Sequence, residues 1–297
     1  MAFIQQKLSN DIVAHMIQTI ILDWYKTNKR NLPWRHTTNP YHILVSEMML
    51  QQTQVDRVIP KYKHFLQTFP TLQALANTSP AEVINEWAGL GYNRRALYLH
   101  KFARAVVDKF AGKIPDNREQ LMTLPGIGPY TSQAIRCFAF GKDVEVVDIN
   151  IKRIYSRIFF RGEGSGQELQ NIARHLIPTG KGVEWNNALM DFGSMVCTDV
   201  PKCTSCPLTE QCSAYKAGTP EKYVKPKQQS KFIGSNRYYR SLVIKELRKD
   251  KEFSSSIIGI KKLKPKEKTD EWFNTIIESL ENDGLIVRKN DTLSLPK

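Results

Sequence analysis

Apolar side chains recur at helical spacing along most of the first 215 residues. In 12–24, for example, they return every three or four positions and follow Ser9 and Asn10, two favoured N-cap residues. The alternation that marks strands is missing from this region of the sequence. The pattern predicts helices over 12–24, 41–52, 54–67, 94–110 and 149–160, with further helices after Pro80, near Asp116 and from Tyr130.

The pattern changes after the last cysteine. Residues 222–231 are polar and basic with one proline, which is typical of a linker. Two helices in succession, followed by a terminal hairpin, indicate a small α/β domain of winged-helix type. The elements predicted there are a helix over 237–249, a strand over 256–260, a helix over 272–280 that stops at Asp283-Gly284, and a hairpin of 285–287 and 293–295.

Composition narrows the class of protein. The 297 residues suffice for two core-bearing domains, and 41% hydrophobic with 24% charged residues is ordinary for a globular protein. Nothing approaches the roughly 18 consecutive apolar residues of a membrane helix. The first residues also lack the basic start and apolar run of a signal peptide. We therefore expect a cytoplasmic protein without a membrane partner.

Positive charge is concentrated near the C-terminus. The chain carries +14 in total, and residues 222–268 hold 15 Lys/Arg against 4 Asp/Glu. A charge of this size indicates a polyanionic partner. A solvated basic linker is the equally simple alternative for the C-terminal segment.

The segment LPGIGPYT, 124–131, lies between two helical patterns. Gly126 and Gly128 can adopt positive φ and allow another chain to come close. The amides that open the next helix have no intrahelical partners, so they suit a phosphate oxygen. The full pattern favours a DNA-binding hairpin over an ordinary glycine turn.

Four of the five cysteines lie together. Cys197, Cys203, Cys206 and Cys212 fall within 16 residues, separated by five, two and five residues, while Cys137 stands apart. Four thiolates can hold a structural zinc ion or a [4Fe-4S] cluster. Only one pair is closely spaced, which mildly favours the cluster, and zinc remains the alternative.

Several motifs together resemble one family. In order they are LPWR (32–35), SEMMLQQTQV (46–55), WAGLGYNRRALYLHK (87–101), LPGIGPYT (124–131), VVDINIKR (146–153) and MDFGSMVC (190–197), followed by the cysteine loop. The chain resembles the helix-hairpin-helix DNA glycosylases of the endonuclease III superfamily, and is most similar to the MutY-type adenine glycosylases.

The resemblance implies a mostly α, two-lobed helix-hairpin-helix fold with an iron–sulfur cluster loop, extended here by the small C-terminal α/β domain. The expected parts are a six-helix module with the hairpin over 33–137, an iron–sulfur helical module from 1–32 and 138–221, a linker over 222–231 and the small domain over 232–297. MutY-type enzymes usually carry a larger C-terminal domain that recognises 8-oxoguanine, and the 66 residues of 232–297 do not resemble it.

The implied function is base-excision repair by a monofunctional DNA glycosylase. The substrate would be double-stranded DNA with a mispaired base, namely adenine opposite guanine or 8-oxoguanine. A thymine/uracil glycosylase for G/T or G/U mismatches is the first alternative, favoured by the short C-terminus. A non-catalytic DNA-binding protein is the second. We expect a monomer associated with the nucleoid.

Two carboxylates match the catalytic positions of the family. Breaking an N-glycosidic bond leaves positive charge on the sugar and negative charge on the base. An ionised carboxyl can stabilise the sugar, and a protonated carboxyl can give its proton to the base. Asp148 would stabilise the sugar cation, although an Asp before a helix is also a good N-cap. Glu47 would protonate the base, which favours adenine because thymine can leave as an anion. Tyr130 stands where bifunctional relatives place a lysine.

The remaining site residues follow from the resemblance alone. Gln52 and Tyr92 would fill the gap that a flipped base leaves in the stack. Trp34 and Arg35 would line the base pocket, and Asn150 would support Asp148.

Overall fold

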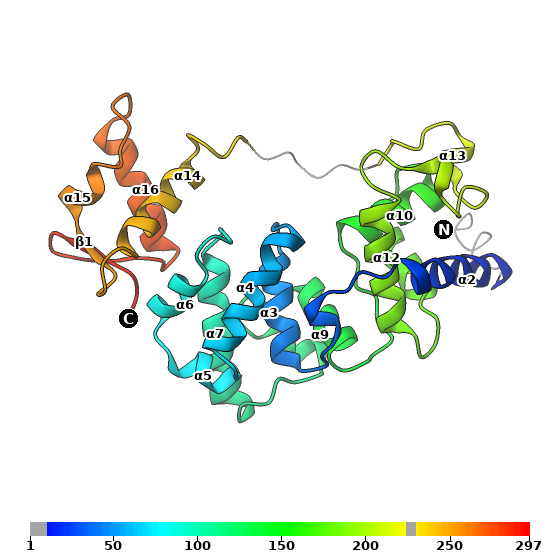
Figure 1. Ribbon diagram of the computed structural model, residues 1–297, viewed down its shortest axis with the longest axis horizontal. Coiled ribbons are helices and arrows are strands. Elements are labelled where there is room, and N and C mark those ends of the chain that lie inside the picture. The colour runs from blue at the N-terminus through cyan, green and yellow to red at the C-terminus, as the bar shows by residue number, and fades with distance from the viewer. Residues whose placement is uncertain (1–10, 224–229) are drawn as a thin grey trace. The chain divides into compact units, whose positions relative to one another are not determined.

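The computed structural model describes residues 11–223 and 230–297, apart from the side chain of Asp11, and divides into two compact units (Figure 1). Unit 1 holds 1–43, 116–118 and 128–227, and unit 2 holds 44–115, 119–127 and 228–297. The domain boundaries given by the sequence stay a prediction. Most of the expected linker, namely 224–229, lies outside the described residues.

Unit 1 is helical, as the apolar periodicity predicts. Its core lies where α2, α10 and α12 pack together around Trp185, Tyr155 and Phe192, all nearly inaccessible to solvent. The Trp24 ring meets Phe192 edge-on at 5.2 Å. The elements are α2 (Asp11–Asn28), η1 (Pro33–Arg35), α9 (Pro129–Phe138), α10 (Ile149–Phe160), α11 (Gly166–His175), α12 (Gly182–Met195), η2 (Cys203–Ser205) and α13 (Ser213–Lys216).

One helix of unit 1 begins inside a stretch that reads as a glycine-rich loop. Ser165 caps α11 by accepting from the Glu168 amide at 3.2 Å, and the Glu168 carboxylate accepts from the Ser165 amide at 2.8 Å. This reciprocal capping box stabilises the start of a helix by about 1 kcal/mol or more, which offsets the destabilising effect of the glycines around it.

The first part of unit 2 is a group of helices around a second core. Trp87, buried at the end of α6, meets Phe65 of α4 edge-on at 5.9 Å. The elements are most of α3 (Pro40–Leu50), α4 (Val55–Thr68), α5 (Leu72–Asn77), α6 (Pro80–Glu86), α7 (Arg94–Phe110) and α8 (Arg118–Met122).

The C-terminal part of unit 2 is the small α/β domain. Its antiparallel sheet has the order β1-β3-β2, with Ser294 paired to both Ser254 and Val287. The order helix, strand, helix, helix, strand, strand supports the winged-helix expectation. The elements are α14 (Asn236–Leu247), β1 (Ser254–Ser256), α15 (Ile257–Lys261), α16 (Asp270–Asn282), β2 (Val287–Lys289) and β3 (Thr292–Ser294).

One strand prediction in this domain is wrong. The run 256–260 was expected to be extended, but β1 ends at Ser256 and Ile257–Lys261 form α15. The Ser256 hydroxyl accepts from the Gly259 amide at 3.1 Å, so it caps a helix where the apolar run alone suggests a strand.

Among the described residues, no helix is long and apolar enough to cross a membrane.

Candidate active site and DNA-contacting residues

Asp148 occupies the N-cap of α10. Its own backbone is extended, its amide donates to the Val146 carbonyl at 3.1 Å, and the Val146 amide is held by the Asn186 side-chain oxygen at 3.0 Å. Asp148 Oδ1 accepts from the Ile151 amide at 2.7 Å. The capping role expected from the sequence is therefore confirmed, and it fixes the carboxylate at the positive end of a twelve-residue helix.

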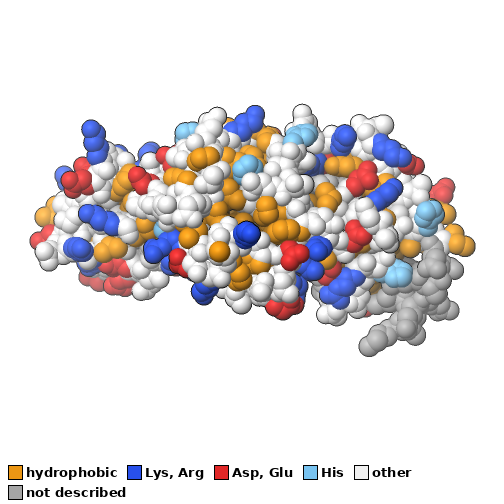
Figure 2. Space-filling model, turned by 90° about the horizontal axis from the view of Figure 1, so that it is seen from below, with side chains coloured by type: hydrophobic (Ala, Val, Ile, Leu, Met, Phe, Trp, Pro, Cys, Tyr) orange, Lys and Arg blue, Asp and Glu red, His pale blue; other side chains and the backbone are white. Residues whose placement is uncertain are grey.

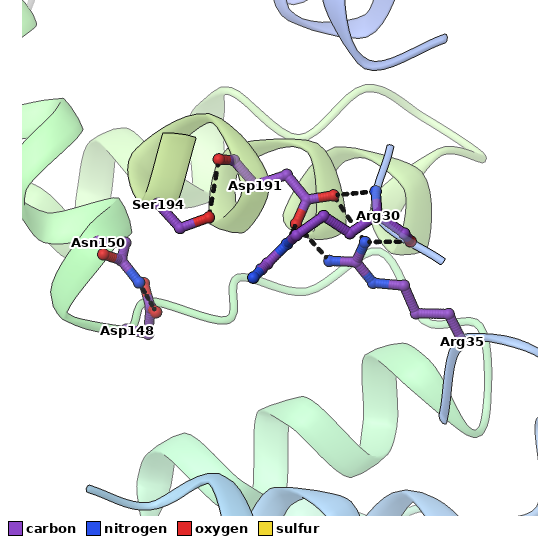
Figure 3. A network of polar contacts seen from close by, with 6 residues as sticks. All are labelled: Arg30, Arg35, Asp148, Asn150, Asp191 and Ser194. Atoms are coloured by element: carbon purple, nitrogen blue, oxygen red, sulfur yellow. Dashed lines mark hydrogen bonds and ion pairs between the residues drawn. The ribbon is translucent and has the colours of Figure 1, made fainter. Parts of the chain in front are cut away.

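The second oxygen of Asp148 is also held. Oδ2 accepts from Asn150 Nδ2 at 2.9 Å, as Figure 3 shows. Burial raises the pKa of Asp148 above its ordinary value, while the bonds from Ile151 and Asn150 and the charge of Arg153 oppose that rise. The carboxylate is thus desolvated yet fixed in one orientation, which suits a group that must stabilise a nearby cation.

Asn150 connects Asp148 to a buried arginine. Its side-chain oxygen accepts from Arg153 Nη2 at 2.7 Å. Arg153 also donates to the carbonyl of Gly193 at 2.6 Å and, through Nε, to that of Cys197 at 2.7 Å. A continuous polar chain therefore runs from the carboxylate to the start of the cysteine loop.

Gly193 allows this chain to form. A Cβ at this position on α12 would lie 2.6 Å from the Asn150 Cβ and 3.2 Å from Ile154 Cδ1. Such a contact is too short for any side chain larger than hydrogen. The glycine of the MDFGSMVC motif is thus required for the close approach of α12 to α10.

Arg35 and Arg30 form ion pairs with a buried carboxylate. Asp191, on α12 and fully inaccessible, accepts from Arg35 Nη1 at 2.6 Å and Nη2 at 2.9 Å, and from Arg30 Nε at 2.5 Å (Figure 3). Burial alone would raise the pKa of Asp191, but the bonds from Arg35 and Arg30 lower it overall. These ion pairs tie η1, with its buried Trp34, to α12. Base binding by Arg35 and Trp34 stays a prediction.

Tyr130 lies in the first turn of α9, after the N-cap Gly128 and Pro129. It packs against the buried cluster of Ala134, Cys137 and Val146, and it lines an open cleft with Val147, the neighbour of Asp148. Basic side chains surround this cleft, accompanied by two carboxylates: Arg118, Arg136, Lys152 and Arg174, with Asp143 and Glu145. The opening of α9, next to Tyr130, is thus an anion-attracting surface.

The hairpin turn before α9 is tightly packed at its first glycine. Gly126 has a φ of +79°, and an added Cβ would lie 2.7 Å from the Tyr98 Cβ. Both its conformation and its surroundings therefore require glycine. The turn closes with the Ile127 amide donating to the Leu124 carbonyl at 3.2 Å.

Glu47 is buried in α3. Its exposed fraction is 7%, and its neighbours Ser46 and Met48 are each 1% exposed. The side chain thus lies inside the apolar helix group and not on its exposed face.

Gln52 and Tyr92 share an unusual backbone conformation. Their φ angles are +56° and +47°, which non-glycine residues rarely adopt and which cluster at functional sites. Tyr92 is 41% exposed, and Gln52 is exposed as well. Both therefore present side chains to solvent from fixed turns.

Sequence reasoning missed the residue that fixes these turns. Arg95 is 7% exposed, and its Nη1 donates to the carbonyls of Met48, Met49 and Gln51 at 2.5 to 2.9 Å. Its Nη2 donates to those of Leu90 and Gly91, each at 3.1 Å. Burial lowers the pKa of Arg95 to about 10. The paired arginines in GLGYNRRAL were the only signal for it.

The four loop cysteines are free thiols of intermediate exposure. Arg157 Nη1 lies 3.4 Å from Cys197 Sγ, and Cys212 Sγ lies 3.6 Å from the Arg157 carbonyl. Burial, with a smaller contribution from charge on the other three cysteines, raises the pKa of Cys206 to about 12, although a backbone bond from Leu208 opposes the rise. In the described part of the chain, no three Cys, His, Asp or Glu side chains converge tightly enough to hold a metal ion.

Surface charge is mixed on the face drawn in Figure 2. Lys and Arg side chains lie there among Asp and Glu side chains. On this face, therefore, contact with an anion depends on local groups and not on a uniformly basic surface.

Comparisons with known proteins identify the family of this chain. Residues 45–179 match the HhH-GPD superfamily of base excision DNA repair proteins. An adenine DNA glycosylase of Mycolicibacterium smegmatis is 38% identical over 77% of this chain and 79% of its own length. A thymine/uracil-DNA glycosylase of Methanothermobacter thermautotrophicus is 35% identical over 66% of this chain and 91% of its own.

The fold is similar to a solved structure as well. The structure of a thermostable thymine-DNA glycosylase superposes with a TM-score of 0.67 at 32% identity, covering 70% of this chain and 99% of that one. The chain therefore belongs to the HhH-GPD superfamily of base excision DNA repair proteins, as one of its MutY-like members.

Proposed function

We propose that the protein is a monofunctional DNA glycosylase that removes adenine mispaired with guanine or 8-oxoguanine. The observation that carries the proposal is Asp148: a part-buried carboxylate with both oxygens held, one by the Ile151 amide and one by the Asn150 side chain. Adenine DNA glycosylases among the relatives support the choice of base.

The reaction needs opposite charge at two points. The bond between C1′ of deoxyribose and the base nitrogen breaks, and its electron pair leaves with the base. Glu47, buried in α3, donates a proton to the departing adenine. Ionised Asp148 stabilises the cationic sugar until water adds to C1′ and gives up a proton. Neither step needs a covalent bond to the protein.

Tyr130 supports the monofunctional character. A Schiff base requires an amine nucleophile, and a phenol in this position cannot supply one. Its place at the start of α9, beside Val146 and Val147, leaves it near the segment that carries Asp148.

DNA is the partner that the remaining features favour. The α9 amides and the basic side chains around Tyr130 suit phosphate oxygens, and such contacts position the protein without reading sequence. We infer that the protein acts as a monomer on double-stranded DNA at the nucleoid.

We also propose a [4Fe-4S] cluster on the cysteine loop, with structural zinc as the alternative. Four thiols on one short loop form a suitable donor set, and Arg157 is placed to donate to Cys197 Sγ. A bound cluster would cross-link the loop on which Arg153 also anchors, and it would take no part in the steps above. A brown protein with near-stoichiometric iron would support the cluster, whereas zinc in the purified protein would contradict it.

Excision of thymine is the second candidate. It is favoured by the thymine/uracil-DNA glycosylase that matches over 91% of its length and by the thermostable thymine-DNA glycosylase fold. Duplexes with A/G, A/8-oxoguanine, T/G and U/G pairs, treated with alkali after incubation, separate the candidates. Breaks at the adenine strands support our proposal, breaks only at T/G or U/G contradict it, and no breaks at all would favour a non-catalytic DNA-binding protein.

A further inference from the structure

The segment after α13 folds back onto the end of α10. The Lys222 amide donates to the Thr219 carbonyl at 3.1 Å, and the Lys222 side chain pairs with Glu163 at 2.7 Å. Gly162, at a φ of +90°, leaves room for this approach, because a Cβ there would lie 2.0 Å from the Lys222 carbonyl oxygen. The beginning of the basic run that was expected to be a linker is therefore held against α10.

Tyr223, at the end of this segment, covers two arginines of α10. Its ring centroid lies 5.6 Å from the guanidinium carbon of Arg153 and 5.0 Å from that of Arg157. The two arginines are about one helical turn apart, and they are 7% and 2% exposed. An aromatic face attracts a guanidinium, and the attraction is strongest where both groups are shielded from water. One ring therefore restrains both arginine side chains.

Arg153 is the link from Tyr223 to the carboxylate. Its Nη2 donates to the Asn150 side-chain oxygen at 2.7 Å and to the Gly193 carbonyl at 2.6 Å. Because the first of these bonds occupies the Asn150 oxygen, the Asn150 NH2 group faces Asp148 Oδ2, at 2.9 Å. An Arg153 side chain that moved away would leave Asn150 able to turn and would withdraw a positive charge from Asp148.

We propose that Tyr223 is a positioning residue for base release: its ring holds Arg153 in place, and Arg153 in turn keeps the Asn150 donor on the catalytic carboxylate. The inference rests on the proposed function for its effect on turnover. Its effect on the Asp148 carboxyl itself does not require the reaction, so the two can be tested apart.

Loss of the Tyr223 ring should raise the pKa of Asp148. Burial already raises this pKa, while the Asn150 bond and the Arg153 charge oppose the rise. Weakening these two opposing contacts leaves burial less compensated, so Asp148 should take up its proton at a higher pH. The charged groups on the other elements around the neighbouring cleft and on α12 stay the same in every variant of the test, namely Arg118, Arg136, Asp143, Glu145, Lys152, Arg174 and Asp191 with its paired arginines.

The test compares Tyr223→Leu, which removes the ring, with Tyr223→Phe, which keeps it. Carbon-13 shifts of labelled aspartate carboxyls in the full-length protein give the pKa of Asp148 without DNA, and Asp148→Asn assigns the signal. In Tyr223→Leu this pKa should be about half a unit higher than in the wild type. Tyr223→Phe should match the wild type, and so should the matched control Tyr215→Leu, whose side chain is exposed on α13.

Single-turnover base release gives the second measurement. The acidic limb of Tyr223→Leu should move to higher pH by the same half unit or so, with the rate on the plateau within about twofold of the wild type. In an Asn150→Ala background, Tyr223→Leu should add little further shift, because the donor that Tyr223 positions is already gone.

Three results would overturn the proposal. They are an unchanged pKa of Asp148 in folded Tyr223→Leu, an equal shift in Tyr223→Phe, and a rate that falls by one factor at every pH, which would make Tyr223 a purely structural contact. A shifted pKa without base release from any duplex would contradict the proposed function and leave the role of Tyr223 standing. Melting temperatures report whether each variant folds, and Tyr223→Met is a second ring-free variant should Tyr223→Leu fail to do so.

Discussion

The Asn150 side chain donates to Asp148 Oδ2 at 2.9 Å and is itself held by Arg153. Asn150 is thereby fixed so that its NH2 group, and not its oxygen, faces the carboxylate. This donor lowers the pKa of a group that burial raises. Asn150, together with the Ile151 amide, therefore increases the fraction of Asp148 that is ionised at a given pH.

Replacement of Asn150 should move the pH dependence of turnover. Because the pKa of Asp148 is already raised, base release should fall as pH drops through a value above that of an ordinary aspartate. Asn150→Ala removes a contact that lowers the pKa, so the acidic limb should shift to higher pH. Single-turnover rates between pH 5 and 9 measure the shift. Asn171→Ala, on the exposed side of α11, is the matched control, and an unmoved limb in the Asn150 variant would refute the coupling.

Gly193 should tolerate no side chain. Gly193→Ala places a methyl group 2.6 Å from Asn150 Cβ, so α12 must move or Asn150 must turn away. Overpacking of this kind costs about 1–3 kcal/mol, and turnover should fall together with the melting temperature. Gly166→Ala is the control, since its added Cβ meets nothing within 4 Å. Equal melting temperatures for the two variants would contradict the close approach.

Asp191 should contribute to the stability of the fold more than to the chemistry of the site. Asp191→Asn leaves Arg35 without its buried partner and should lower the free energy of unfolding by about 3 kcal/mol at neutral pH. Because the pKa of Asp191 is lowered in the folded state, this stabilisation exists at neutral pH and is lost as pH falls through that value. The difference in unfolding free energy between variant and wild type should shrink in acid. Denaturant titrations at pH 7 and at steps below pH 3.8, the ordinary pKa of an aspartate, check it, and a difference that stays equal throughout would count against the ion pairs.

Tyr130→Lys should introduce a lyase activity, which we do not expect of the wild-type protein. An amine at the start of α9, beside the segment that carries Asp148, could attack C1′ and form a Schiff base. Borohydride should then trap a covalent protein–DNA adduct, while Tyr130→Phe gives none. Failure to trap any adduct with a folded Tyr130→Lys protein would argue against the placement of residue 130 near the sugar.

Local signals in the sequence predict most helices and the capping role of Asp148, because periodicity and capping act within one or two turns. The beginning of α11 was missed although Ser165 and Glu168 form a capping box that is readable without a structure. The strand expected over 256–260 failed because Ser256 caps a helix. In both cases a capping residue outweighed the composition of the surrounding run.

Contacts between distant segments were beyond sequence reasoning. Asp191 and Arg35 are 156 residues apart, and nothing in either motif shows that they pair. Arg95 likewise looks like a surface residue until the carbonyls of two turns converge on it. The requirement for Gly193 depends on the approach of α10, which only the fold supplies.

The most direct test of the account is the rate of base release by Asp148→Asn. Asparagine can still cap α10, and it carries no charge that burial would penalise, so the variant should melt at or above the wild-type temperature. Loss of the charge that stabilises the sugar should lower the single-turnover rate on an A/8-oxoguanine duplex by at least about a hundredfold, with binding retained. A folded Asp148→Asn protein that releases adenine at the wild-type rate would contradict the account.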